Sequence, residues 1–198
     1  MSTNAIKNAH DGHHDHELEV RDRDLYGFWI YLMTDCILFG SLFICFLVLG
    51  AGYPAYKFDL SLVMTETILL LTSSFTMGLA VLSMHKKKAI SVYFWLLVTF
   101  LLGAGFLVIE LKEFAHLIAE GKGYTTHAYF SAFFTLVGTH GIHVFFGLLY
   151  MLALVAQIMI HGITPRTTTK LLLLSLFWHF LDIVWIIVFS VVYLIGGL

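Results

Sequence analysis

Four acidic side chains and three histidines occur within long apolar segments of this sequence, where a charge is costly. They are Asp35, Glu66, Glu110, His140, His143, His179 and Asp182. A charged residue at the centre of a membrane span costs about 2.5–3.5 kcal/mol on insertion, so such a group needs a partner or a function. Carboxyl groups and imidazoles in this setting can carry protons, ligate a metal or haem, or hydrogen-bond neighbouring helices. These seven residues are therefore the candidate functional residues.

Two pairs among them are three residues apart and so lie one turn from each other on a helix. The pairs are His140 with His143 and His179 with Asp182. This spacing suits hydrogen bonds to neighbouring helices, although His140 and His179 could also face each other as axial haem ligands. Nothing else in the sequence supports haem binding, so we expect both pairs to be buried structural groups.

A di-iron site is a further alternative. Glu113 and His116 form one copy of the Glu-x-x-His spacing found in di-iron carboxylate bundles. Those sites need two copies and two additional inward glutamates. The sequence has the one copy, at the end of an apolar segment, and it has no cysteine cluster and no phosphate-binding G-x-x-x-x-G-K-[ST] loop. We therefore expect no catalytic, cofactor or metal site that is complete within this chain.

The elements that position these residues are five apolar stretches, each long enough to cross a membrane as a helix of about 20 residues. The chain is 59% hydrophobic and 12% charged, which leaves too few polar side chains to cover a soluble domain. Runs such as KLLLLSLF do not alternate, which favours helices over a β-barrel. The sequence therefore predicts an all-α integral membrane bundle with spans at about 25–50, 60–84, 89–111, 128–160 and 171–194.

The distribution of charge predicts the orientation of the bundle. Eight of the eleven Lys and Arg residues fall in residues 1–24 or in the segments that follow the second and fourth stretches. The positive-inside rule then places the N-terminus in the cytoplasm and the C-terminus in the periplasm. Tyr and Trp residues near the predicted ends, Tyr129 and Tyr193 among them, are expected in the headgroup layer.

The first 24 residues differ in composition from the remainder. They are polar and contain His10, His13, His14 and His16 among acidic residues, which could bind a metal ion adventitiously. We expect residues 1–24 to form a disordered His-rich cytoplasmic tail without a signal peptide, and residues 25–198 to form the five-helix membrane domain. The net charge of −2 argues against a nucleic-acid partner.

Two functions of different class fit these features. One is a non-catalytic subunit whose polar residues order helices and lipids inside a larger complex. The other is a small proton or solute transporter, in which the four buried acids relay protons. Transporters often have helices broken by Gly or Pro at mid-depth and repeated halves. The sequence has neither a mid-depth proline nor matching halves, so the first function is favoured.

Five further segments occur in this order: GFWIYLMTDCILFGSLF (27–43), ETILLLTSSFTMG (66–78), GAGFLVIELKEF (103–114), SAFFTLVGTHGIHV (131–144) and SLFWHFLDIVWIIVFSVVYL (175–194). Together they resemble subunit III of the haem–copper oxidases and cover nearly the whole chain after the tail. Within that family, the sequence of these segments is most similar to that of members from bacterial bo-type ubiquinol oxidases. The pairing of T-H-G-x-H-V with W-H-F-x-D-x-V-W is the most specific part.

This resemblance implies a respiratory complex in the bacterial inner membrane that oxidises ubiquinol, reduces oxygen and translocates protons. In that family, haems and copper belong to subunit I, and subunit III carries none. Subunit III packs chiefly against subunit I, with subunits II and IV in the same complex, binds phospholipids, and supports assembly, proton uptake and sustained turnover. A cytochrome c or menaquinol oxidase subunit III, or a homologue associated with nitric oxide reductase, remains an alternative because the donor site lies on other subunits.

The resemblance also carries over to individual residues. Asp35 occupies the place of the family's buried carboxylate, which is usually Glu in the seven-helix cytochrome c oxidase versions and reacts there with carbodiimides. Glu66 begins the second segment, and Glu110 stands where the family has a glutamate at the end of the corresponding helix. The two histidine-containing signatures supply His140, His143, His179 and Asp182.

Overall fold

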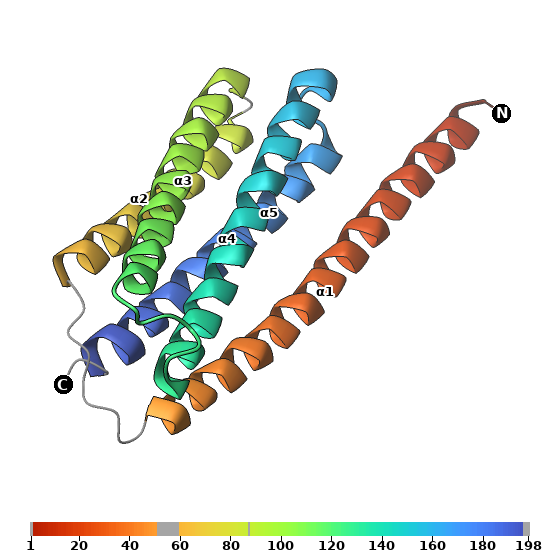
Figure 1. Ribbon diagram of the computed structural model, residues 1–198. Helices are drawn as coiled ribbons and strands as arrows, with labels where there is room; N and C mark the ends of the chain where they lie inside the picture. Colours follow the sequence, from red (N-terminus) through yellow and green to blue (C-terminus); the bar gives the residue numbers. More distant parts are fainter. Residues whose placement is uncertain (1, 51–59, 87, 196–198) are drawn as a thin grey trace. The chain divides into compact units, whose positions relative to one another are not determined.

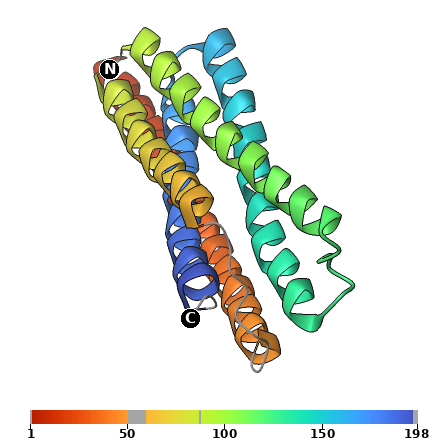
Figure 2. The same ribbon diagram turned by 60° about the vertical axis from the view of Figure 1, so that its left-hand side comes forward.

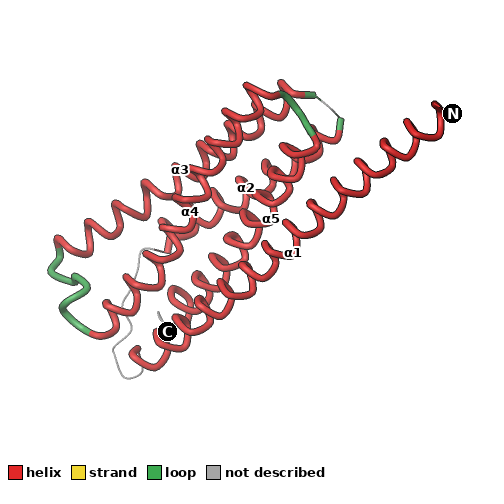
Figure 3. Tube along the Cα trace, turned by 90° about the vertical axis from the view of Figure 1, so that its right-hand side faces the viewer, coloured by secondary structure: helices red, strands yellow, loops and turns green. Residues whose placement is uncertain are grey.

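The computed structural model describes the backbone of residues 2–50, 60–86 and 88–195. Side chains are described for Arg23 and from Leu25 to Tyr193, apart from those within residues 51–59 and at residue 87. The chain divides into two compact units, Met1–Cys36 and Ile37–Leu198. The described residues form helices and the loops between them, without strands (Figure 3).

Helix α1 (Ser2–Gly50) makes up the first unit and continues into the second. Its membrane-length portion is Leu25–Gly50, in agreement with the first predicted span. The backbone of residues 2–24 is helical here, whereas the sequence predicts a disordered tail over residues 1–24. The division into a tail and a membrane domain stays a prediction.

The second unit holds the other four membrane-length helices. These are α2 (Leu60–His85), α3 (Ala89–Ala119), α4 (Ala128–His161) and α5 (Pro165–Val188), and a π-helix, η1 (Phe189–Ile195), continues the last of them. Together with the described part of α1, five helices are long and apolar enough to cross a membrane. The prediction of an all-α bundle with five spans is therefore confirmed.

Two helices extend beyond the predicted spans because polar residues continue the helical pattern. Helix α3 runs past residue 111 to Ala119, through the Glu-x-x-His segment. Helix α5 begins at Pro165, ahead of the predicted residue 171. Its start is fixed by a capping box, in which the side chains of Thr164 and Thr167 each accept a hydrogen bond from the other's backbone N–H. Proline at the first helical position removes an N–H that would have no partner there.

Helices α2–α5 form a closed arrangement in which each helix contacts two others. Helix α2 contacts α3 and α5, and α4 contacts α3 and α5. The ribbon shows the four helices side by side in two views (Figures 1 and 2). Because α2 and α3 are antiparallel and joined by a short turn, the first half of α2 lies beside the last half of α3.

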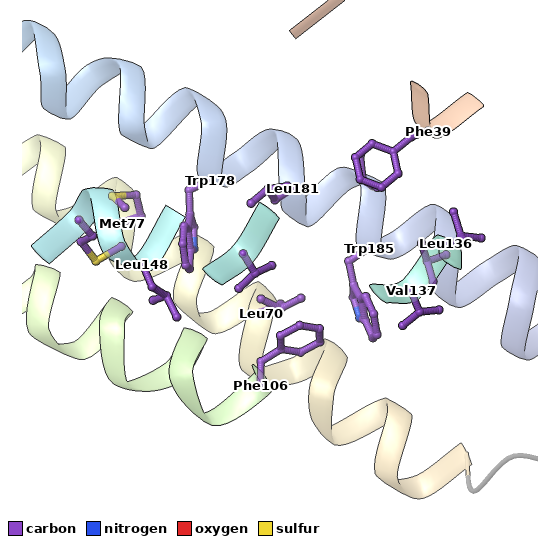
Figure 4. Packing of buried hydrophobic residues seen from close by; sticks show 14 of the residues in the cluster. Phe39, Leu70, Met77, Phe106, Leu136, Val137, Leu148, Trp178, Leu181 and Trp185 are labelled. Atoms are coloured by element: carbon purple, nitrogen blue, oxygen red, sulfur yellow. The ribbon is translucent and has the colours of Figure 1, made fainter. Parts of the chain in front are cut away.

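The core of this bundle is built around two tryptophans of α5. Trp178 and Trp185 are buried between aliphatic and aromatic side chains from α2, α3 and α4 (Figure 4). Glycines make room for Trp178: a Cβ atom added at Gly103 of α3 would lie 2.8 Å from its ring, and one added at Gly147 of α4 would lie 3.1 Å away. Small residues at such contacts let membrane helices approach closely.

The part of α1 that belongs to the second unit packs on α4 through aromatic rings. The ring of Phe39 lies 5.3 Å from the ring of His143, and the ring of Phe46 lies 5.3 Å from that of Tyr129. Centroid separations of 4.5–7 Å are typical of favourable aromatic contacts. This end of α1 is therefore anchored to α4 by apolar contact.

Candidate functional site: two polar clusters in one bundle

The first polar cluster lies between the beginning of α2 and the end of α3. Glu66 of α2 is 0% exposed and Glu110 of α3 is 2% exposed. The charge of Glu110 interacts with those of Glu66 and Glu113, and the charge of Glu66 interacts with that of Glu113. The antiparallel pairing of α2 and α3 thus brings together glutamates that are far apart in the sequence. We call Glu66, Glu110, Glu113, Tyr129 and Tyr193 the acidic cluster.

Helix α4 approaches the acidic cluster closely at a glycine. A Cβ atom added at Gly141 would lie 3.2 Å from Oε1 of Glu110. A larger side chain at this position would press on the carboxyl group, so the glycine leaves the space in which that carboxyl group lies. The close packing of α4 at Gly141 therefore limits the space of the Glu110 carboxyl group on one side.

Two tyrosines complete the acidic cluster. Tyr193 of η1 is 2% exposed, and its phenol interacts electrostatically with Glu66, Glu110, Glu113 and Tyr129. Tyr129, near the start of α4, is also buried. Their expected place in the headgroup layer stays a prediction, because burial against other helices does not fix depth in a membrane. The change to π-helical winding at Phe189 rotates residues 189–195 relative to α5, which changes the direction in which Tyr193 points.

The second polar cluster lies further along α2, where hydroxyl groups face α3 and α5. The indole N–H of Trp178 donates to Oγ of Ser73 at 3.0 Å, and Oγ of Ser74 lies 2.6 Å from Nδ1 of His179. The hydroxyls of Thr76 and Thr99 are 2.8 Å apart. We call these six residues the hydroxyl cluster. Its pairs join α2 to α3 and α5 across the membrane interior, as polar side chains do between membrane helices.

The two histidines of α4 lie in different surroundings. His140 is 0% exposed, and its ring lies against Phe39, Phe106 and Trp185. Neither of its ring nitrogens has a hydrogen-bond partner among the described residues. His143, one turn later, is partly buried, and its Nδ1 lies 2.7 Å from the carbonyl oxygen of Thr139 on its own helix.

The remaining candidates lie on α5 and α1. Asp182 is half-buried one turn after His179, and the charges of the two residues interact. Oδ1 of Asp182 is buried without a hydrogen-bond partner in the described part of the chain. Asp35 lies on α1 within the first unit, near the middle of the span Leu25–Gly50. Its role as a buried carboxylate stays a prediction.

The geometry of these side chains does not fit a haem or metal centre built from them. The ring of His140 is enclosed by aromatic side chains, and Nδ1 of His179 is hydrogen-bonded to Ser74, so the two do not form an axial pair. Over residues 60–86 and 88–193, as in the rest of the described chain, no three His, Cys, Asp or Glu side chains gather where they could hold a metal ion. Glu113 joins the acidic cluster, whereas His116 faces Glu120 at 3.1 Å.

The structure brings together three residues that the sequence analysis did not group. Glu113 lies one turn from Glu110, a spacing that could have indicated a shared face. Ser74 is not among the candidate residues, and its contact with His179 depends on the pairing of α2 with α5. No local signal in the sequence marks the burial of Tyr193.

The fold and these clusters define a class of protein: a multi-pass helical membrane protein whose interior polar groups largely join its own helices. The particular family follows from comparison with known proteins. The family model for cytochrome c oxidase subunit III matches residues 4–197. The chain belongs to this family.

Curated relatives match over nearly their whole length. Cytochrome bo(3) ubiquinol oxidase subunit 3 of Pseudomonas aeruginosa is 54% identical, over 98% of this chain and 96% of the relative. The protein of the same name from Pseudomonas putida is 55% identical over 87% and 86%. Quinol oxidase subunit 3 of Bacillus subtilis is 43% identical over 92% of each chain. The resemblance drawn from the sequence is thereby confirmed.

Proposed function

We propose that this chain is subunit III of a quinol oxidase complex and that it contributes structure rather than a catalytic site. The observation that carries the proposal is the near full-length match, at 54% identity, to a subunit III of a ubiquinol oxidase. The hydroxyl cluster supports it, because its polar side chains form pairs with one another across helix interfaces. The haems and copper of such a complex belong to another subunit in this proposal.

The proposed partners are the other oxidase subunits and membrane lipids. Large apolar side chains are exposed on several helices, for example Ile37, Phe75, Ile90 and Phe146. Exposed apolar surface of this kind is stable against lipid tails or against another membrane helix. We assign the principal contact to subunit I, with subunits II and IV and phospholipids around it. The complex lies in the bacterial inner membrane, with the N-terminus of this chain cytoplasmic and its C-terminus periplasmic.

Purification of the complex through a tag on this chain tests the proposal. We expect haem, copper and quinol oxidase activity to co-purify with the chain in mild detergent. The same metal analysis on the chain expressed alone should find neither haem nor copper. Stoichiometric metal on the isolated chain would contradict the proposal.

The electron donor is tested in the same preparation. We expect oxidation of ubiquinol and no oxidation of reduced cytochrome c, because the three relatives described above are named as quinol oxidases. Menaquinol is the third donor to compare. Turnover with reduced cytochrome c alone would place the chain in the other branch of the family.

Asp35 is proposed to support helix and lipid packing rather than proton delivery to the oxygen site. Replacement by Asn keeps the shape of the side chain and removes its charge. We expect Asp35→Asn to leave the initial rate of quinol oxidation close to that of the wild type. Loss of most activity in a complex that retains its haems and copper would assign Asp35 a role in proton transfer.

A further inference from the structure

The acidic cluster contains two carboxyl groups that the packing of the bundle encloses. All four carboxyl oxygens of Glu66 and Glu110 are buried without a hydrogen-bond partner among the described residues. The groups whose charges act on them are other glutamates: Glu113 on Glu66, and both Glu66 and Glu113 on Glu110. Two further titratable groups, the phenols of Tyr193 and Tyr129, face the same space from η1 and α4.

Helix α4 closes one side of the space in which these two carboxyl groups lie. A Cβ atom added at Gly141 of α4 would lie 3.2 Å from Oε1 of Glu110, so helix backbone bounds the carboxyl group on that side. The neighbouring His140 turns its ring toward Phe106 and Trp185. Its charge interacts with that of His143 on its own helix.

Two neighbouring carboxylates in such a place cannot both be ionised. Each negative charge loses its hydration on burial and is repelled by the other, and both effects favour the neutral acid. A neutral carboxyl group also gains an O–H donor, which it can give to the oxygen of a neighbouring carboxyl group. Carboxyl pairs that share a proton in this way titrate as one unit.

We propose that Glu66 and Glu110 form a proton-binding site, a carboxyl pair that retains at least one proton at neutral pH across the interface of α2 and α3. Tyr193 and Glu113 border the pair and extend it toward the end of the bundle. Glu66 lies about 9 Å along the helix axis from the first residue of α2, at 1.5 Å per residue. The site therefore lies in the first half of α2.

Infrared spectroscopy of the whole oxidase complex tests the proposal. Protonated carboxyl groups and ionised carboxylates absorb at separate frequencies, and the protonated band shifts when the complex is transferred to D₂O. We expect Glu66→Gln and Glu110→Gln each to remove or shift absorption in the protonated band. The matched control is Glu120→Gln, since Glu120 forms an exposed ion pair with Lys122 at 2.7 Å. It should remove absorption in the carboxylate band instead.

Three results would overturn the proposal. One is loss of carboxylate absorption alone in both cluster variants. Another is an unchanged protonated band when Glu66 and Glu110 are replaced together. The third is failure of both single Gln variants to assemble with haem and copper, because Gln is neutral and has the shape of protonated Glu. Normal assembly combined with loss of the protonated band supports the proposal.

A pH titration of the protonated band separates a shared proton from two independent ones. In the wild type, we expect the last protonated component to persist to a higher pH than in either single variant, because each variant lacks the partner that shares the proton. Equal midpoints in the wild type and both variants would show independent groups and would contradict the pair.

Discussion

Helix α2 carries Glu66 in its first half and Ser73, Ser74 and Thr76 in its second half, and all four side chains are buried in the same bundle. The hydroxyls have partners on α3 and α5. The carboxyl group of Glu66 has no hydrogen-bond partner in the described part of the structure, and its neighbouring charges have its own sign. The comparison separates polar groups that hold helices together from polar groups that the helices enclose for another purpose.

The difference follows from the chemistry of the two kinds of side chain. A hydroxyl can donate and accept at once, so a Ser or Thr within the membrane is satisfied by one neighbour and its own backbone. Thr99, for example, contacts Thr76 and also donates to the carbonyl oxygen of Trp95 at 2.8 Å. An ionised carboxylate accepts hydrogen bonds and cannot donate them, so carboxyl groups can bond to each other only when at least one is protonated.

Removing the central residue of the hydroxyl cluster should have the largest effect on stability. Trp178→Ala deletes a buried aromatic ring and leaves Ser73 without its donor. We expect a loss of about 3–5 kcal/mol, as for other buried Trp→Ala changes. Thermal unfolding of the complex in detergent measures it, with Phe94→Ala on the exposed face of α3 as the control. A loss of stability no larger than that of the control would contradict the role of Trp178 in the core.

The pair of Ser74 and His179 should show a smaller effect that depends on the partner. His179→Leu removes the ring nitrogen that lies 2.6 Å from Oγ of Ser74, while Ser74 keeps its hydrogen bond with Asp182. We therefore expect the loss of one hydrogen bond, about 0.5–1.5 kcal/mol. Ser74→Ala should cost less in the His179→Leu background than in the wild type, because the contact with His179 is then already absent. Complex yield and thermal stability of the two single variants and the double variant measure the coupling. Strictly additive losses would show that the hydrogen bond contributes nothing.

The pair of Thr76 and Thr99 should contribute less to stability than the pair of Ser74 and His179. Each hydroxyl retains an alternative acceptor on its own helix, the carbonyl oxygen of Ser73 or that of Trp95. We expect a coupling energy of about 0.6 kcal/mol between Thr76→Val and Thr99→Val, the average for polar pairs in a membrane protein. A double-mutant cycle on thermal stability measures it. A coupling above that of Ser74 and His179 would reverse this ranking.

The acidic cluster should show the smallest effect. Glu66→Gln replaces the carboxyl group by a neutral amide of the same shape, whose N–H can donate to Glu110 as the shared proton does. The stability of the complex at neutral pH should therefore change less than in the variants of the hydroxyl cluster. A larger loss of stability in Ser74→Ala than in Glu66→Gln would sharpen the comparison between the two halves of α2. A large loss in Glu66→Gln would mean that the charge of Glu66 holds the bundle together.

The number of spans followed from local composition, because each apolar stretch must satisfy its backbone within one helix. The last turns of α3 and the first turn of α5 did not follow from composition. Polar residues such as Glu113 and Thr167 continue these helices beyond the apolar stretches. The glutamates of the acidic cluster are visible in the sequence one by one. Their grouping depends on the antiparallel pairing of α2 with α3, and the approach of Tyr193 depends on a change of helical winding after residue 188.

The glycines around Trp178 also constrain how this sequence can change over time. The indole ring fits between Gly103 and Gly147, on two different helices, and a single methyl group at Gly103 would come within 2.8 Å of it. A substitution at Gly103 is therefore tolerated only when the side chain at residue 178 becomes smaller, and the reverse change leaves a cavity. Residues 103 and 178 should therefore covary: among relatives, a residue larger than glycine at 103 should occur together with a residue smaller than tryptophan at 178.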